Sequence, residues 1–199
     1  IFQMGLSEFG QGFLQFMTRS FVCRKFKNCN FVQPDMIRFL FLLTLLLTLP
    51  AYGQSKAYKT MLKTYYNDFP TISIADAYQK IGKKGVYFLD TREDAEFKVS
   101  HIKSARQVGY DNFDLSSVRD LKKDAEIIVY CSMGARSQGI GEKLKIAGFT
   151  NVKNLYGGLF HWVNSNYPVV DSNDNKTDKI HGYSKLWGKW VKQGTVVYY

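Results

Sequence analysis

One short segment of this chain brings a potential nucleophile close to a potential anion-binding cation. Cys131 and Arg136 are separated by four residues in the sequence Cys131-Ser132-Met133-Gly134-Ala135-Arg136-Ser137. The β-forming run at 127–130 leads into this segment, and a helix-like stretch at 137–147 follows it. A strand, a short loop and a helix in this order place a side chain at the carboxyl end of a sheet, where open α/β folds bind their ligands.

The loop between this strand and this helix is expected to hold negative charge. Backbone N–H groups of a loop that curls over a helix N-terminus converge on one point and favour an anion there. We therefore expect the loop to favour the thiolate form of Cys131, which is the nucleophilic form of a cysteine. Gly134 supplies a residue that tolerates a positive φ angle. The candidate binding residues are Ser132, Met133, Gly134, Ala135 and Ser137.

Arg136 has two candidate roles in such a loop. Its planar fork could bind the oxygens of a small anionic ligand through two parallel hydrogen bonds. Alternatively, the side chain could turn inward and brace the loop. We favour the first alternative from the sequence, which makes Arg136 a catalytic residue together with Cys131.

Two further motifs flank the cysteine loop in the sequence. Upstream, Asp90-Thr91-Arg92-Glu93 precedes Ser100-His101-Ile102, and downstream there is Asn154-Leu155-Tyr156-Gly157-Gly158. Together with the cysteine loop, these motifs make residues 71–168 resemble the rhodanese (thiosulfate:cyanide sulfurtransferase) family in its single-domain form. The sequence departs from the family's usual pattern on a connecting turn, at Ser100, Ser104 and Gln107.

This resemblance implies a fold and a reaction. The fold would be a three-layer α/β domain with a mostly parallel central sheet flanked by helices. The reaction would move a sulfane sulfur from a small anionic donor such as thiosulfate to a thiol or to cyanide, through a persulfide on Cys131 and without a metal or cofactor. The resemblance also implies a structural salt-bridge network at Asp90 and Arg92. We expect His101 to be a capping or core histidine rather than a catalytic base.

Other functions remain open on the same motifs. The protein could be a persulfide carrier or binding module that delivers sulfur to a partner, with thiosulfate turnover incidental. A phosphatase-like or arsenate-reductase-like enzyme is disfavoured, because the related phosphatase loop holds one more residue between cysteine and arginine and so admits a phosphate group. A module that has lost its chemistry is disfavoured because Cys131 and Arg136 are both present.

The N-terminal part of the chain has the features of a leader. Residues 36–53 combine a positive start at Arg38, an apolar core at 39–49 and small residues before Gln54, which is the pattern of a secretory signal peptide. We expect cleavage near Gly53-Gln54, export to the periplasm or the exterior, and no stable membrane insertion afterwards. Residues 1–35 are interpreted as a non-native upstream segment.

Behind the leader, the chain reads as alternating elements. Residues 54–70 are predicted to be helical, and the domain proper is expected at 71–168. Strands alternate with helices, which indicates a parallel sheet; we predict strands at 86–89, 105–109, 127–130 and 152–155, and helices at 73–81, 115–123, 137–147 and 158–165. Residues 169–199 form an aromatic and basic extension. The spacing of its apolar residues predicts a single helix that docks on the domain through one face, formed by Leu186, Trp187, Trp190 and Val191.

The charge of the chain adds little about its partners. The formal net charge is +10, but the lysines are scattered and no nucleic-acid-binding motif is present. We therefore expect no nucleic-acid partner. A positive surface would instead steer small dianions toward the cysteine loop.

Overall fold

The computed structural model describes residues 56–66 and 68–199. The signal peptide predicted at 36–53 and the upstream segment at 1–35 both lie outside these residues and stay predictions. Within the described part of the chain, no helix is long and apolar enough to cross a bilayer.

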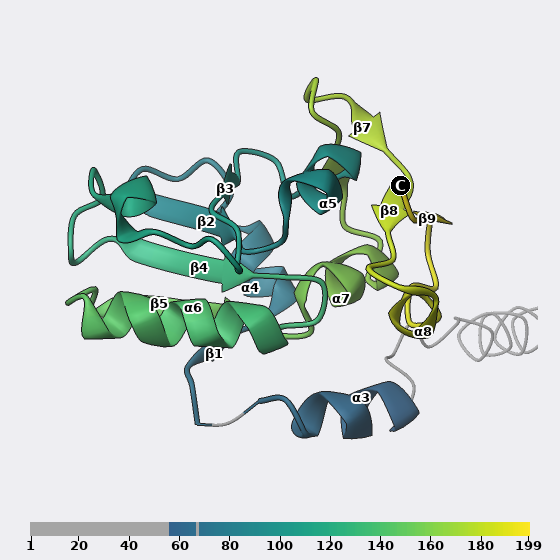
Figure 1. Cartoon of the computed structure of the whole chain (residues 1–199), viewed down its shortest axis with the longest axis horizontal. Helices are drawn as coiled ribbons and strands as arrows, with labels where there is room; N and C mark the ends of the chain where they lie inside the picture. The colour runs from purple at the N-terminus through teal and green to yellow at the C-terminus, as the bar shows by residue number, and fades with distance from the viewer. Residues whose placement is uncertain (1–55, 67) are drawn as a thin grey trace, which may run out of the picture. The chain divides into compact units, whose positions relative to one another are not determined.

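Five parallel strands form the central sheet (Figure 1). Across the sheet they follow the order β1 (Thr71–Ile72), β5 (Asn151–Leu155), β4 (Glu126–Tyr130), β2 (Val86–Asp90) and β3 (Arg106–Gln107). Every neighbouring pair is parallel. The prediction of an α/β fold with a mostly parallel sheet is therefore confirmed. Because Asp90 pairs with Tyr130, the residues that follow β2 and β4 leave the sheet side by side.

Alternate side chains of the strands enter two separate hydrophobic cores, as the pleat of a strand requires. In β4, Ile127 and Val129 pack toward α6 (Ala135–Ile146) and a 3-10 helix (Leu115–Val118). Ile128 and Tyr130 pack on the opposite face. That face is covered by α3 (Lys56–Lys63), α4 (Ile74–Tyr78) and α7 (Gly158–Asn164). Helices thus cover both faces of the sheet, which is the predicted three-layer arrangement.

A short helix that the sequence analysis did not predict follows β2. This helix, α5 (Asp94–Val99), begins with a reciprocal capping box between Glu93 and Glu96. The backbone N–H of Glu93 donates to Oε2 of Glu96 at 3.2 Å, so two otherwise unpaired N–H groups of the first turn are satisfied. The cap also holds the Glu96 carboxylate at the carboxyl end of the sheet.

The C-terminal extension docks on the domain, but the predicted single helix is wrong. Only α8 (Lys185–Gly188) is helical. The extension also contains β6 (Val169–Val170) paired with β7 (Lys176–Thr177), and β8 (Lys179–His181) paired in parallel with β9 (Thr195–Val197). Gly188 ends the helix, and Tyr198 packs so closely on it that a Cβ there would collide with the phenol. The extension therefore folds back on itself, and the residue that follows β9 packs on the end of α8.

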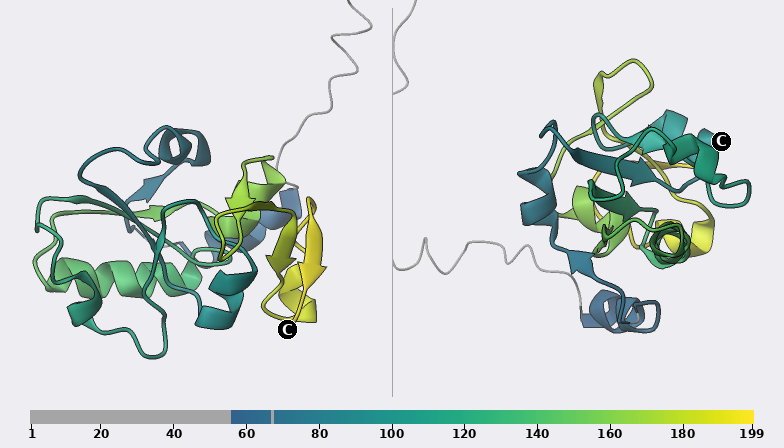
Figure 2. Two further views of the ribbon diagram at one scale, coloured as in Figure 1. Left: turned by 90° about the horizontal axis from the view of Figure 1, so that it is seen from above. Right: turned by 90° about the vertical axis from the view of Figure 1, so that its left-hand side faces the viewer.

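The docked extension meets α3 at one end of the domain, as Figure 1 and the left view of Figure 2 show. The ring of Trp190 lies 5.4 Å from that of Tyr58 on α3, and Val191 joins the hydrophobic core. Leu186, also assigned to the buried face, is 63% exposed. The two segments that flank the domain in sequence are thus packed against each other in space.

Candidate active site

Cys131 is the first residue after β4 and lies at the carboxyl end of the sheet. Its side chain is buried, and Sγ accepts a hydrogen bond from the backbone N–H of Gly134 at 3.0 Å. The loop then enters α6, whose N-cap is Gly134. The sequence-predicted order of strand, loop and helix therefore brings the sulfur to a backbone donor.

Four consecutive carbonyl groups of the loop are each held by a different partner. The N–H of Leu159 donates to the carbonyl oxygen of Cys131 at 2.8 Å, and the N–H of Phe160 donates to that of Ser132 at 3.0 Å. The hydroxyl of Tyr66 donates to the carbonyl oxygen of Met133 at 3.0 Å. The side-chain amide of Asn154 donates to the carbonyl oxygen of Gly134 at 2.8 Å. Within a trans peptide plane, N–H and C=O point in opposite directions. Fixing these carbonyls therefore fixes the N–H groups of the loop, and one of these groups, the N–H of Gly134, donates to Sγ.

Two glycines allow these contacts. Gly134 has a φ angle of 105° and Gly158 one of 58°, and both values lie in the region that favours glycine. A Cβ on Gly158 would collide with the carbonyl oxygen of Cys131, and one on Gly134 would collide with the hydroxyl of Tyr66. The close approach of α7 to the cysteine loop thus explains Gly158 of the downstream motif, whereas a Cβ on Gly157 would collide with the side chain of His161.

Tyr66 is a residue that the sequence analysis missed. Besides its contact with Met133, its hydroxyl lies 3.0 Å from the carbonyl oxygen of Leu155 and accepts the N–H of Gly157 at 2.7 Å. Burial and the neighbouring Cys131 raise the pKa of Tyr66, so the hydroxyl stays protonated. A tyrosine that precedes the predicted domain therefore ties the cysteine loop to the turn before α7.

Arg136 is bound to a carboxylate of the protein itself. Its Nη1 and Nη2 donate to Oε2 and Oε1 of Glu96, both at 2.8 Å, and Nη2 also contacts Oγ of Ser132 at 3.2 Å. Burial alone would raise the pKa of Glu96, but the hydrogen bonds and charge of Arg136 hold that pKa below its usual value. This geometry is that of the bracing alternative, in which the arginine links the cysteine loop to α5.

The other sequence-predicted residues lie behind the site. Arg92 forms a fully buried ion pair with Asp90 and donates to the carbonyl of Ser100 at 2.6 Å. His101 is also buried, stacks on the ring of Phe97 and places Nδ1 3.0 Å from the Phe97 carbonyl oxygen. These contacts hold the segment after β2, and none of these residues lines the cavity at Cys131.

A cavity of about 190 Å³ opens beside Cys131. The loop contributes Cys131, Ser132, Met133, Ala135 and Arg136, and the remaining wall consists of Tyr65, Tyr183 and Trp187. Two other predicted binding residues, Gly134 and Ser137, lie deeper. The hydroxyl of Ser137 donates to Oδ1 of Asn154 at 2.8 Å, so Ser137 supports the loop rather than the cavity wall.

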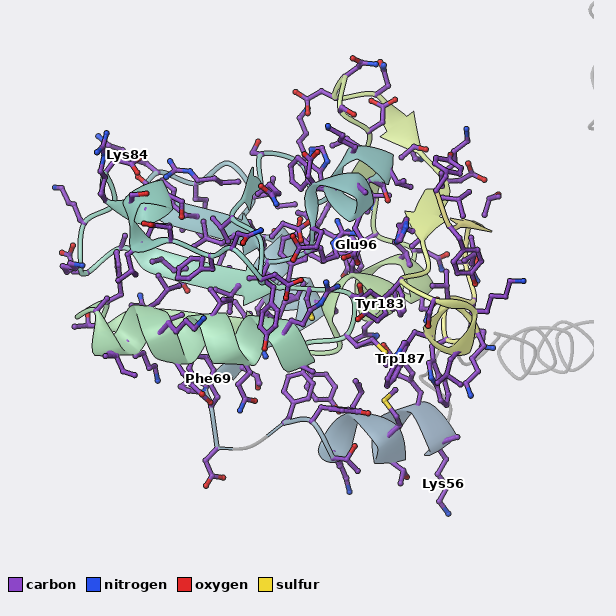
Figure 3. All side chains as sticks on the ribbon, in the orientation of Figure 1. Lys56, Phe69, Lys84, Glu96, Tyr183 and Trp187 are labelled. Atoms are coloured by element: carbon purple, nitrogen blue, oxygen red, sulfur yellow. The ribbon has the colours of Figure 1, made fainter. Side chains whose placement is uncertain are left out.

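The aromatic wall was not predicted as part of the site. Figure 3 shows Tyr183 and Trp187 at the same end of the sheet as Glu96. The sequence indicated only that the extension is rich in aromatic residues. Tyr183 lies before α8 and has a φ angle of 62°, so helical spacing gave no signal for its position beside Trp187. Among the residues that the structure describes, no cluster of three or more histidine, cysteine or acidic side chains could hold a metal ion.

Comparisons with known proteins agree with these features. Residues 73–165 match the model of the rhodanese-like domain. The chain is similar to thiosulfate sulfurtransferase GlpE of Coxiella burnetii, with 27% identity over 107 residues, 54% of this chain and 98% of the relative. It is similar to rhodanese-like domain-containing protein 17 of Arabidopsis thaliana, with 34% identity over 125 residues, 55% of this chain and 79% of the relative. A tRNA uridine(34) hydroxylase of Listeria welshimeri is 36% identical over 76 residues, 36% of this chain but 24% of the hydroxylase.

Proposed function

Because the chain belongs to the rhodanese-like family, we propose that it is a sulfurtransferase that carries a sulfane sulfur as a persulfide on Cys131. The observation that carries the proposal is the loop geometry: Sγ of Cys131 accepts the N–H of Gly134 and opens into a cavity. The similarity to a thiosulfate sulfurtransferase along nearly its whole length supports the same reaction class. Thiosulfate as donor, and a thiol or cyanide as acceptor, are part of the proposal.

The reaction has two displacement steps. The thiolate of Cys131 attacks the outer sulfur of thiosulfate, the S–S bond of the donor breaks, and sulfite leaves with the bonding electron pair. An acceptor thiolate or cyanide then attacks the outer sulfur of the persulfide and restores the Cys131 thiolate. Splitting the transfer through a covalent intermediate replaces one difficult step with two easier ones.

The loop stabilises the charge that both steps place on sulfur. Since its carbonyl groups are held by α7, Tyr66 and Asn154, its N–H groups are oriented before the reaction begins. Hydrogen-bond donors that do not have to reorient during the reaction stabilise developing charge more than flexible hydrogen-bond donors do. We assign Arg136 the supporting task of holding Ser132 and the loop against Glu96, in place of the donor clamp favoured from the sequence.

The proposal is tested by the mass of the protein. Thiosulfate treatment should add about 32 Da, one sulfur atom, and cyanide should remove it with formation of thiocyanate, as a covalent two-step mechanism requires. Cys131→Ser should show neither change, whereas Ser116→Ala, which alters an exposed hydroxyl away from the cavity, should behave as the wild type. Thiocyanate formation at the wild-type rate by Cys131→Ser would refute the proposal. Turnover of an aryl phosphate without any sulfur adduct would favour the phosphatase alternative.

A further inference from the structure

The cavity at Cys131 has two chemically different sides. One side is the cysteine loop, and the other is an aromatic wall of Tyr65, Tyr183 and Trp187. All three rings lie outside residues 73–165, the part that matches the family model. The aromatic wall is thus an addition of this chain to the matched domain, and it faces the atom that the proposed reaction uses.

The rings of this wall are held in place by specific contacts. The rings of Tyr65 and Trp187 lie 5.8 Å apart with an edge-to-face angle of 69°, an arrangement that aromatic pairs prefer. The ring of Tyr183 lies 4.8 Å from the guanidinium carbon of Arg136. Tyr183 also has a φ angle of 62°, and its N–H donates to Nδ1 of His181 at 3.1 Å. A bulky residue keeps such a backbone angle only where its surroundings hold it.

The side chains that line the cavity carry little uncompensated charge. Among the described residues that line the cavity, there is no Asp, Glu, His or Lys, and Arg136 is the single basic side chain. Its two terminal nitrogens already donate to Glu96, and Tyr183 covers the guanidinium. The cation is therefore largely neutralised within the protein. The remaining surface is that of aromatic and aliphatic side chains, which attract apolar groups.

The size of the cavity suits one ring. An apolar cavity of about 150 Å³ is large enough to bind benzene, and this one has about 190 Å³. A phenyl group seated against Trp187 would therefore fit while a sulfur atom attached to it reaches toward Cys131.

We propose that the aromatic wall is a subsite for an apolar, ring-sized organic group carried by the sulfur compound, so that aryl-type organosulfur compounds are preferred to small inorganic or alkyl ones. The inference deepens the proposed function and rests on it. With an aryl thiosulfonate, the Cys131 thiolate attacks the terminal sulfur, the sulfur–sulfur bond breaks, and the aryl sulfinate leaves with the electron pair. Atoms and charge balance without any further reactant.

The kinetic test compares benzenethiosulfonate with methanethiosulfonate, which present the same charge and the same sulfane sulfur. The wild type should show a kcat/KM for persulfide formation about 10- to 100-fold higher with the phenyl compound. Trp187→Ala should reduce this ratio about 5- to 10-fold. Tyr65→Ala, at a residue that is 38% exposed, serves as a second variant whose fold is not at risk. Leu186→Ala is the matched control, because Leu186 lies on α8 outside the cavity.

A second arm asks whether the ring belongs to the donor or to the acceptor. Persulfide-loaded protein is discharged with phenylmethanethiol or with ethanethiol, and a preference confined to one half-reaction identifies the source of the ring. A phenyl preference in either half-reaction, the loading or the discharge of Cys131, supports the proposal. Equal rates for phenyl and alkyl compounds in both half-reactions of the wild type would overturn it, as would a preference that survives in both Trp187→Ala and Tyr65→Ala.

A binding measurement separates this inference from the proposed function. Benzenesulfinate and methanesulfinate, the products of the donor reaction, are titrated into the protein and followed by nuclear magnetic resonance. Tighter binding of benzenesulfinate that is lost in Trp187→Ala supports the subsite even if no donor loads Cys131, in which case the sulfurtransferase proposal fails alone. Persulfide formation without any phenyl preference in rate or binding would leave the sulfurtransferase intact and remove the subsite.

Discussion

Replacing Arg136 with alanine is expected to destabilise the whole domain as well as slow sulfur transfer. In the structure the guanidinium makes two 2.8 Å hydrogen bonds to Glu96 and one contact to Ser132. Removing it leaves a carboxylate whose side chain is only 5% exposed without its main partner. It also frees the cysteine loop from α5. A donor clamp would have neither effect, because a clamp faces open solvent until the donor binds.

The magnitude follows from the burial of the pair. Removing one partner of a buried ion pair costs about 3–5 kcal/mol. Arg136 is 18% exposed, and Glu96 keeps hydrogen bonds from Ser132 and from the backbone of Glu93. We therefore expect Arg136→Ala to lower the free energy of unfolding by about 2–4 kcal/mol. This contribution is present above the usual carboxyl pKa of 4.5 and is lost as pH falls through the lower pKa of folded Glu96.

Urea unfolding and transfer kinetics measure the two effects together. Lys98→Ala is the matched control, because it breaks an exposed ion pair with Asp94 on the same helix and should cost about 0.5 kcal/mol or less. Adding Glu96→Gln to Arg136→Ala should recover part of the lost stability, since no unpaired charge stays buried. The loss of activity should be similar for thiosulfate and for an uncharged sulfane donor. Unchanged stability, with a loss confined to the charged donor, would refute the bracing argument.

Three further outcomes follow from the contacts of the cysteine loop and from the burial of a histidine on α7. Tyr66→Phe should lower the free energy of unfolding by about 1–3 kcal/mol, because the N–H of Gly157 loses its acceptor; urea titration measures this. Gly158→Ala should cost at least about 2 kcal/mol, through its positive φ angle and a backbone collision. Gly148→Ala, also at positive φ but in open space, should lower the free energy of unfolding by less in the same urea titration and leave persulfide formation unchanged. Burial and a nearby lysine lower the pKa of His161 from 6.5 to about 4. Since the unfolded chain takes up that proton first, stability should fall as pH drops from 6.5 to 4, and His161→Gln should flatten this slope.

The order of elements around the nucleophile could be predicted from the sequence because it depends on neighbouring residues. The apolar run before Cys131, the glycine in the loop and the helical stretch after it are local signals, and β4, the loop and α6 follow them. The alternation of strands and helices likewise leads to a parallel sheet, because a parallel pair needs a crossover between its strands. Short elements were less predictable: the helix expected at 115–123 is a 3-10 helix of four residues.

Only the tertiary structure decided which partner each site residue has. The sequence could not distinguish the two roles of Arg136, because its carboxylate partner lies 40 residues away on a short helix that the sequence analysis did not predict. The aromatic wall has the same origin. Tyr65 and Trp187 meet because α3 and the C-terminal extension bury their apolar surfaces against the same end of the domain. Residue types and spacing therefore determined the chemistry that is available at Cys131. Packing between distant segments determined the charge, the shape and the walls of the cavity, because such contacts gain their free energy from surface that becomes buried only when the chain has folded.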